Sequence, residues 1–199
     1  MTGSSTGWTC GAARVLRFTS PEQCAAYTPT GSPSTSTALH LVSDGAQHAP
    51  KNIVLAKPAY GPDHLARVLG AHAHELVAVH HESVYPPGTG WPRPPFPVFD
   101  LETLGELPAL EHLSLTRTTL HGPPAYLGAL RSLALTDATF DTLAELVANC
   151  PSLERLRFTV ANPVVRRETS ECWADTVADA SARGVHVETE VTDGLKMQQ

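Results

Sequence analysis

The clearest pattern in the chain is a six-residue alternation of apolar and polar positions that occurs three times. Its windows are LEHLSL at 110–115, LRSLAL at 130–135 and LERLRF at 153–158. In each window the last two apolar side chains lie on one face of a short strand, and the residue between them lies on the other face. The central leucines, Leu113, Leu133 and Leu156, follow one another at spacings of 20 and 23 residues. This regularity predicts a stack of similar units, each with one strand and one returning segment.

The returning segments are expected to differ from one another. Apolar residues at helical spacing within 139–151 predict a short helix that ends at Pro151. By contrast, 120–127 (LHGPPAYL) contains two adjacent prolines, which predict an irregular connection or one turn of tight helix.

Each window has apolar residues at its first, fourth and sixth positions, and we call these three positions the frame. The frame continues less regularly toward the C-terminus and the N-terminus. A helix from about Ser170 to Ala182 and a strand at 185–191 form the expected C-terminal unit. Upstream, a strand is expected to bury Val77 and Val79, with His74 at the first position of its frame. Two further degenerate units are expected around Leu16 and Leu39. Because a strand near Ile53 follows so soon, residues 38–56 could instead form a hairpin.

These elements predict a single domain over 12–199 that follows a flexible N-terminus at 1–11. Within the domain we expect degenerate repeats at 12–83, clear repeats at 101–160 and a helix–strand cap at 170–191. A proline-rich insertion at 84–97 separates the two sets of repeats. Its aromatic group could cover the side of the stack or form an exposed recognition loop; this group consists of Tyr85, Trp91, Phe96 and the nearby Phe99.

Composition narrows the possible partners and the compartment. The chain has 199 residues, of which 42% are hydrophobic, and its net charge is −6. This acidic balance argues against nucleic acid or an anionic membrane surface as a partner. No apolar run approaches the roughly 20 residues of a membrane span, and residues 1–20 lack the pattern of a signal peptide. We therefore expect a cytoplasmic protein with reduced cysteines and no cofactor.

The window LAELVANCPSLERLRF, residues 143–158, resembles the cysteine-containing leucine-rich repeats of F-box-type proteins. The resemblance rests on Cys150, Pro151, Leu153, Leu156 and Phe158. It implies an α/β fold: a short, irregular leucine-rich-repeat solenoid with parallel strands on its concave face and helices or irregular segments on its convex face. It also implies that Cys150 is a buried residue at a helix end.

The chain departs from the leucine-rich-repeat pattern at the asparagine that usually follows each strand. Thr118, Ala138 and Ala161 stand at this position. No F-box-like segment is evident, so the resemblance does not extend to a role in ubiquitin ligation. What it does imply is a protein that binds other proteins, such as a bacterial adaptor or an immunity-type inhibitor.

The strand frame also predicts which side chains point away from the core. Arg155 and Arg157 are the strongest candidates on this face, because a guanidinium group can bind a carboxylate through two hydrogen bonds. An ordinary solvated sheet face would show the same pattern. The predicted partner-binding residues are His112, Ser114, Thr116, Arg155, Arg157, His186 and Glu188.

A histidine group in the N-terminal half supports a second hypothesis, an enzyme that could depend on a metal. The group comprises His64, His72, His74, His80 and His81, of which His72, His74 and His80 are the candidate ligands. The HExxH spacing of zinc proteases is absent, and strand alternation would send His80 and His81 to opposite faces. Neither a GxSxG motif nor a phosphate-binding glycine loop is present, so no catalytic residue is assigned.

Overall fold

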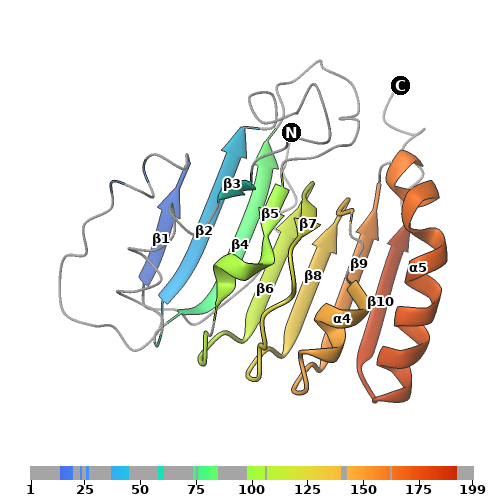
Figure 1. Cartoon of the computed structure of the whole chain (residues 1–199). Helices are drawn as coiled ribbons and strands as arrows, with labels where there is room; N and C mark the ends of the chain where they lie inside the picture. Colours follow the sequence, from blue (N-terminus) through green and yellow to red (C-terminus); the bar gives the residue numbers. More distant parts are fainter. Residues whose placement is uncertain are drawn as a thin grey trace.

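The computed structural model describes residues 14–19, 23, 26, 37–44, 58–60, 74, 76–84, 98–105, 107–139, 143–161 and 163–191. Most of its strands belong to one large sheet, seen as the row of arrows in Figure 1. Every neighbouring pair in this sheet is parallel. The strands lie side by side in chain order: β1 (Arg14–Phe18), β2 (Thr37–Asp44), β4 (Leu76–Val84), β6 (His112–Thr116), β8 (Ser132–Thr136), β9 (Arg155–Val160) and β10 (His186–Val191).

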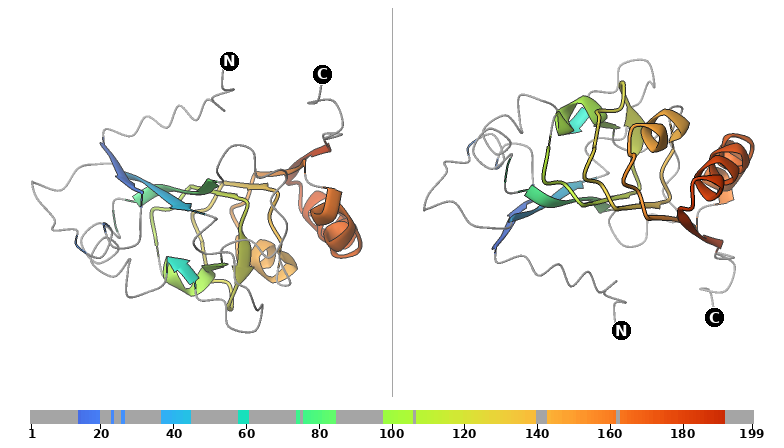
Figure 2. Two further views of the ribbon diagram at one scale, coloured as in Figure 1. Left: turned by 90° about the horizontal axis from the view of Figure 1, so that it is seen from above. Right: turned by 90° about the horizontal axis from the view of Figure 1, so that it is seen from below.

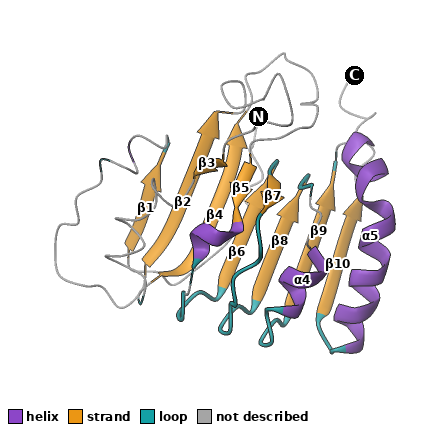
Figure 3. Ribbon diagram, viewed as in Figure 1, coloured by secondary structure: helices purple, strands orange, loops and turns teal. Residues whose placement is uncertain are grey.

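The connections between these strands form a second layer. Figure 2 shows this layer on one side of the large sheet, and Figure 3 distinguishes its helices from its strands. The protein is therefore α/β with a parallel sheet. We call the opposite side of the large sheet, on which no described element packs, the open face. The second layer contains the small sheet β3 (Pro58–Tyr60), β5 (Val98–Asp100) and β7 (Thr119–His121), the 3-10 helix η2 (Leu101–Leu104), and the helices α4 (Leu143–Ala148) and α5 (Pro163–Ala182).

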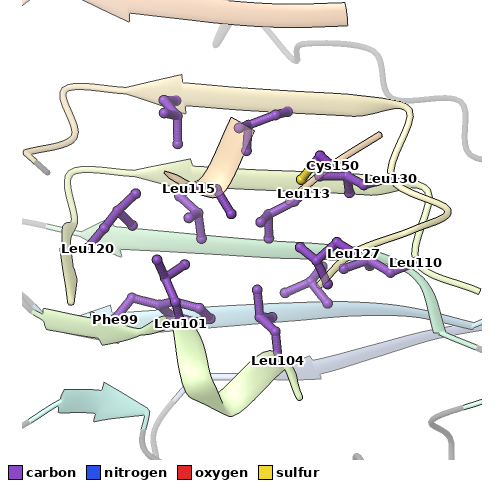
Figure 4. Packing of buried hydrophobic residues seen from close by; sticks show 14 of the residues in the cluster. Phe99, Leu101, Leu104, Leu110, Leu113, Leu115, Leu120, Leu127, Leu130 and Cys150 are labelled. Atoms are coloured by element: carbon purple, nitrogen blue, oxygen red, sulfur yellow. The ribbon is translucent and has the colours of Figure 1, made fainter. Parts of the chain in front are cut away.

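Two rows of side chains run across the large sheet and fill the space between the layers. The first row is Leu16, Leu39, Val79, Leu113, Leu133, Leu156 and Val187. The second row is Phe18, Leu41, His81, Leu115, Leu135 and Phe158. Adjacent strands are about 4.8 Å apart, so each side chain packs on its equivalents in the next strands. Figure 4 shows Leu113 and Leu115 gathered with Phe99, Leu101 and Leu104 of the second layer.

The predicted frame of β4 is displaced by two residues. Val79 is buried as expected, but the first buried residue of the frame is Leu76, and Val77 is only half-buried. The register explains the difference: Val79 pairs with Leu113, so the equivalent of Leu110 is Leu76. His74 lies exposed in the preceding turn, and His81 stands where the other strands have a leucine or phenylalanine.

Two other expectations about the elements are also corrected. The hairpin at 38–56 does not form with β2, because β2 is bordered by the parallel strands β1 and β4. Helix α5 begins at Pro163, before the predicted Ser170, since proline is favoured in the first turn of a helix. The expected flexible segment at 1–11 and most of the insertion at 84–97 lie outside the described residues, but Phe99 is buried in the core.

The turns that leave β6 and β8 share one backbone conformation. Arg117 and Asp137 both have positive φ angles, of 52° and 47°. This conformation is uncommon without glycine, but aspartate tolerates it comparatively well. The Asp137 carboxylate accepts a hydrogen bond of 2.8 Å from the Ala161 N–H group in the next unit. The side chain of Asp137 thus links neighbouring units.

The C-terminal end of the stack is closed by α5 and by the loop that follows it. The Trp173 ring stacks on Phe158 with a centroid distance of 4.0 Å. The Arg183 guanidinium donates hydrogen bonds of 2.9 Å and 3.0 Å to the carbonyl oxygens of Val147 and Cys150, at the end of α4. Among the described helices, none is both long and apolar enough to cross a membrane.

Candidate interaction face

The predicted partner-binding residues lie on the open face in three rows that cross the strands. The central part of this face runs over β6, β8, β9 and β10. Its first row is His112, Ser132, Arg155 and His186; the second is Ser114, Ala134, Arg157 and Glu188; the third is Thr116, Thr136, Thr159 and Glu190. Each of these residues alternates along its strand with the buried residues of the core, which is why the sequence pattern could place them.

The middle of the open face is formed by small side chains. Ser132 and Ala134 are only 6% and 9% exposed although they point away from the core. Their neighbours in the rows are longer: His112 and Arg155 flank Ser132, and Arg157 adjoins Ala134. The small side chains of β8 are therefore largely covered by the longer polar groups beside them.

Acidic side chains of β10 pair with one of the two predicted arginines. Arg157 lies 3.2 Å from Glu190 and 3.9 Å from Glu188. His186 in turn lies 3.3 Å from the Glu188 carboxylate. Glu190 was not among the predicted residues, although its place two residues after Glu188 in the strand could have indicated it. All of these side chains are well exposed, so the pairs contribute little to stability.

The second arginine has different surroundings. Arg155 makes no ion pair within the described part of the chain, whereas nearby Arg131 pairs with Glu154. Burial lowers the pKa of His112 below the usual 6.5, Glu111 opposes this shift, and the positive charges of Arg155 and Arg131 lower the pKa further. His112 is therefore a neutral imidazole beside a guanidinium group at neutral pH.

The histidines of the alternative hypothesis are separated by the fold. His64 and His72 lie outside the described residues, and His74 is exposed in the turn before β4. His80 points to the open face, while His81 is fully buried, so the two face opposite sides as the alternation predicted. The described residues contain no group of three or more side chains that could hold a metal ion.

His81 instead belongs to a polar contact inside the core. Its Nδ1 lies 2.9 Å from the Thr118 hydroxyl, and its ring lies 5.2 Å from that of Phe99. The Thr118 hydroxyl donates its proton to the Thr116 carbonyl oxygen, so the imidazole N–H is the donor in this contact.

Cys150 has the chemistry of a core residue. It is fully buried at the end of α4, and burial raises the pKa of its thiol to about 12, against a smaller opposing effect of Arg183. A thiol with this pKa remains protonated and is a poor nucleophile.

The sequence matches no family model, and no curated protein or solved structure is significantly similar to the chain.

Proposed function

We propose that the chain is a short leucine-rich-repeat-type solenoid that acts as a non-enzymatic protein-binding module, an adaptor or an inhibitor, and that its partner binds the open face. Three parallel strands with the same frame, β6, β8 and β9, support the repeat assignment because Leu113, Leu133 and Leu156 occupy equivalent places in neighbouring strands.

The observation that carries the functional proposal is the division of the large sheet into two different sides. One side is packed under the second layer (Figure 2). The open face carries polar and charged side chains, among them Arg157, Glu188 and Glu190, on strands whose other side is buried in the core. Side chains on a parallel sheet have fixed spacings, so a partner meets a preformed surface and little ordering is required on binding.

The chemistry of the described residues favours this proposal over an enzyme. The buried Cys150 thiol is protonated, and His80 and His81 point to opposite faces of β4. Neither arrangement supplies the nucleophile and base, or the converging ligands, that the alternative would need.

The experiment that tests this function compares the two sides of the molecule. A photoreactive amino acid is introduced at Ser114 on the open face or at Tyr126, which is 65% exposed on the connecting layer. Crosslinked proteins are identified by mass spectrometry and the strongest candidate is purified. We expect crosslinking from position 114 and only background from position 126.

The affinity of the purified partner for variants of the chain then shows which side of the large sheet it binds. Ser114→Trp places a large ring on the open face and should weaken binding, whereas Tyr126→Ala should leave it unchanged. Thermal unfolding confirms that both variants are folded. Equal binding by Ser114→Trp and wild type, together with crosslinking from position 126, would show that the partner uses the other side.

A further inference from the structure

We propose that the open face receives an aspartate or glutamate side chain of the protein partner between Arg155 and His112, above Ser132, and that His112 takes up a proton when this carboxylate binds. The inference rests on the proposed function and adds to it the chemistry of the contact and its dependence on pH.

The geometry of the first row of the open face carries the proposal. Ser132 is paired in register with His112 on one side and with Arg155 on the other. With about 4.8 Å between strands, the flanking side chains rise from backbones two strand spacings apart, so their polar ends can contact one carboxylate from opposite sides. Ser132 is small and only 6% exposed, which means that the surrounding side chains already cover most of it.

Charge distinguishes Arg155 from its neighbours. Arg157 is held by Glu188 and Glu190, and Arg131 by Glu154, while Arg155 has no acidic partner among the described residues. A carboxylate from a partner would therefore give Arg155 a counter-ion without displacing any ion pair made by the described residues. Guanidinium is well suited to this role because it donates two parallel hydrogen bonds to one carboxylate.

The charged and titratable groups around His112 determine how it would respond. Glu111 is its sequence neighbour at 4.0 Å, Arg131 lies directly before β8, Arg155 is the first residue of β9, and the open face of β4 carries His80 and Glu82. The two arginines favour the neutral imidazole. A carboxylate placed between Arg155 and His112 would offset their effect and favour the protonated ring.

The sign of the pH dependence follows from this coupling. Free His112 titrates below 6.5, and bound carboxylate raises that pKa, so the complex holds more protons than the free protein between the two values. Affinity should therefore increase as the pH falls through this interval. It should become constant once the free protein is protonated as well.

The test uses the full chain and an acetylated, amidated tetraglutamate peptide, with tetraglutamine as the matched neutral peptide. Binding is followed by NMR through the Arg155 side-chain N–H signal and the His112 ring signals. We expect both to shift with tetraglutamate alone. Arg155→Met should weaken binding by about tenfold, the effect of one charge-assisted contact. Arg157→Met should weaken binding less than Arg155→Met, since Arg157 is already paired. Arg17→Met, which changes an exposed arginine of β1 far along the sheet, is the control and should change the affinity less than twofold.

His112→Gln tests the proton uptake separately. Above the pH range in which the peptide carboxylates themselves titrate, wild-type affinity should rise as the pH falls toward the pKa of free His112, and the variant should lack this rise. Several results would overturn the inference: a larger loss in Arg157→Met than in Arg155→Met, a pH dependence that survives in His112→Gln, no shift with tetraglutamate, or tighter binding of inorganic phosphate at the same signals. Crosslinking from position 114 is independent of this peptide, so the proposed function could stand while the carboxylate contact fails.

Discussion

Replacing Arg183 should weaken the C-terminal end of the stack, because this side chain joins the last two units. Its guanidinium donates to the carbonyl oxygens of Val147, in the last turn of α4, and of Cys150, just after the helix. Each carbonyl also accepts one backbone N–H group, so Arg183 supplies its second donor. A hydrogen bond to a charged group is worth about 1.5–3 kcal/mol when it is sheltered from water. Arg183 is itself largely exposed, which reduces its contribution.

We therefore expect Arg183→Met to lower the free energy of unfolding by about 1.5–3 kcal/mol in total for the two bonds. Methionine keeps much of the aliphatic stem and removes the donors. Arg183→Lys should lose about half as much, because a single ammonium group is less suited than a planar fork to bridging both carbonyls. Urea denaturation followed by circular dichroism measures each value.

Arg131→Met is the matched control, since Arg131 is an exposed arginine whose ion pair with Glu154 joins neighbouring units at the surface. It should cost less than about 1 kcal/mol. A second measurement follows Cys150, whose buried thiol should react with a thiol reagent faster in Arg183→Met, as located by mass spectrometry. If Arg183→Met and Arg131→Met had equal stability and Cys150 reacted no faster, the structural role of Arg183 would be refuted.

Three further predictions concern the core rows and the polar residues beside them. Leu133→Asp should prevent folding, because it buries an unpaired charge in the centre of the first core row. Ser114→Asp on the open face should instead fold with near-native thermal stability. Thr118→Val should cost about 1–3 kcal/mol in urea denaturation, since it leaves the imidazole N–H of His81 without its hydroxyl acceptor; an unchanged midpoint would contradict this reading. The pKa of His112 is lowered in the native protein, so the unfolded chain binds more protons between that pKa and 6.5. The free energy of unfolding should therefore fall as the pH decreases from 6.5 toward the native pKa and level off below it, and this part of the pH dependence should be absent in His112→Gln.

The sequence predicted best those elements whose pattern repeats. Leu113, Leu133 and Leu156 share one environment, so the same three-position frame identifies each of their strands and the outward residues between them. Only the α/β class and the parallel sheet follow directly from the structure; the leucine-rich-repeat assignment and the binding role remain predictions.

The frame of β4 was misplaced for a physical reason. A core row normally contains apolar residues, so Val77 and Val79 were the natural pair to bury, and a histidine at the next frame position was not expected. The structure buries His81 and satisfies its ring nitrogen through Thr118, a residue 37 positions away. Hydrogen bonds between distant residues cannot be read from local periodicity, and the same limit applies to the pairing of Arg157 with Glu190.

Buried and outward residues along each strand have different roles, so the open face can be changed without changing the fold. Stability comes from the frame residues, since a buried leucine contributes roughly 1.5–3 kcal/mol, whereas an exposed ion pair such as Arg157–Glu190 contributes at most about 1 kcal/mol. Changes at outward positions should therefore alter what the surface binds while the stack remains folded. This is why Arg155→Met and Arg157→Met can be compared directly: they lie on the same strand at equivalent outward positions, and they differ chiefly in that Arg157 already has acidic partners.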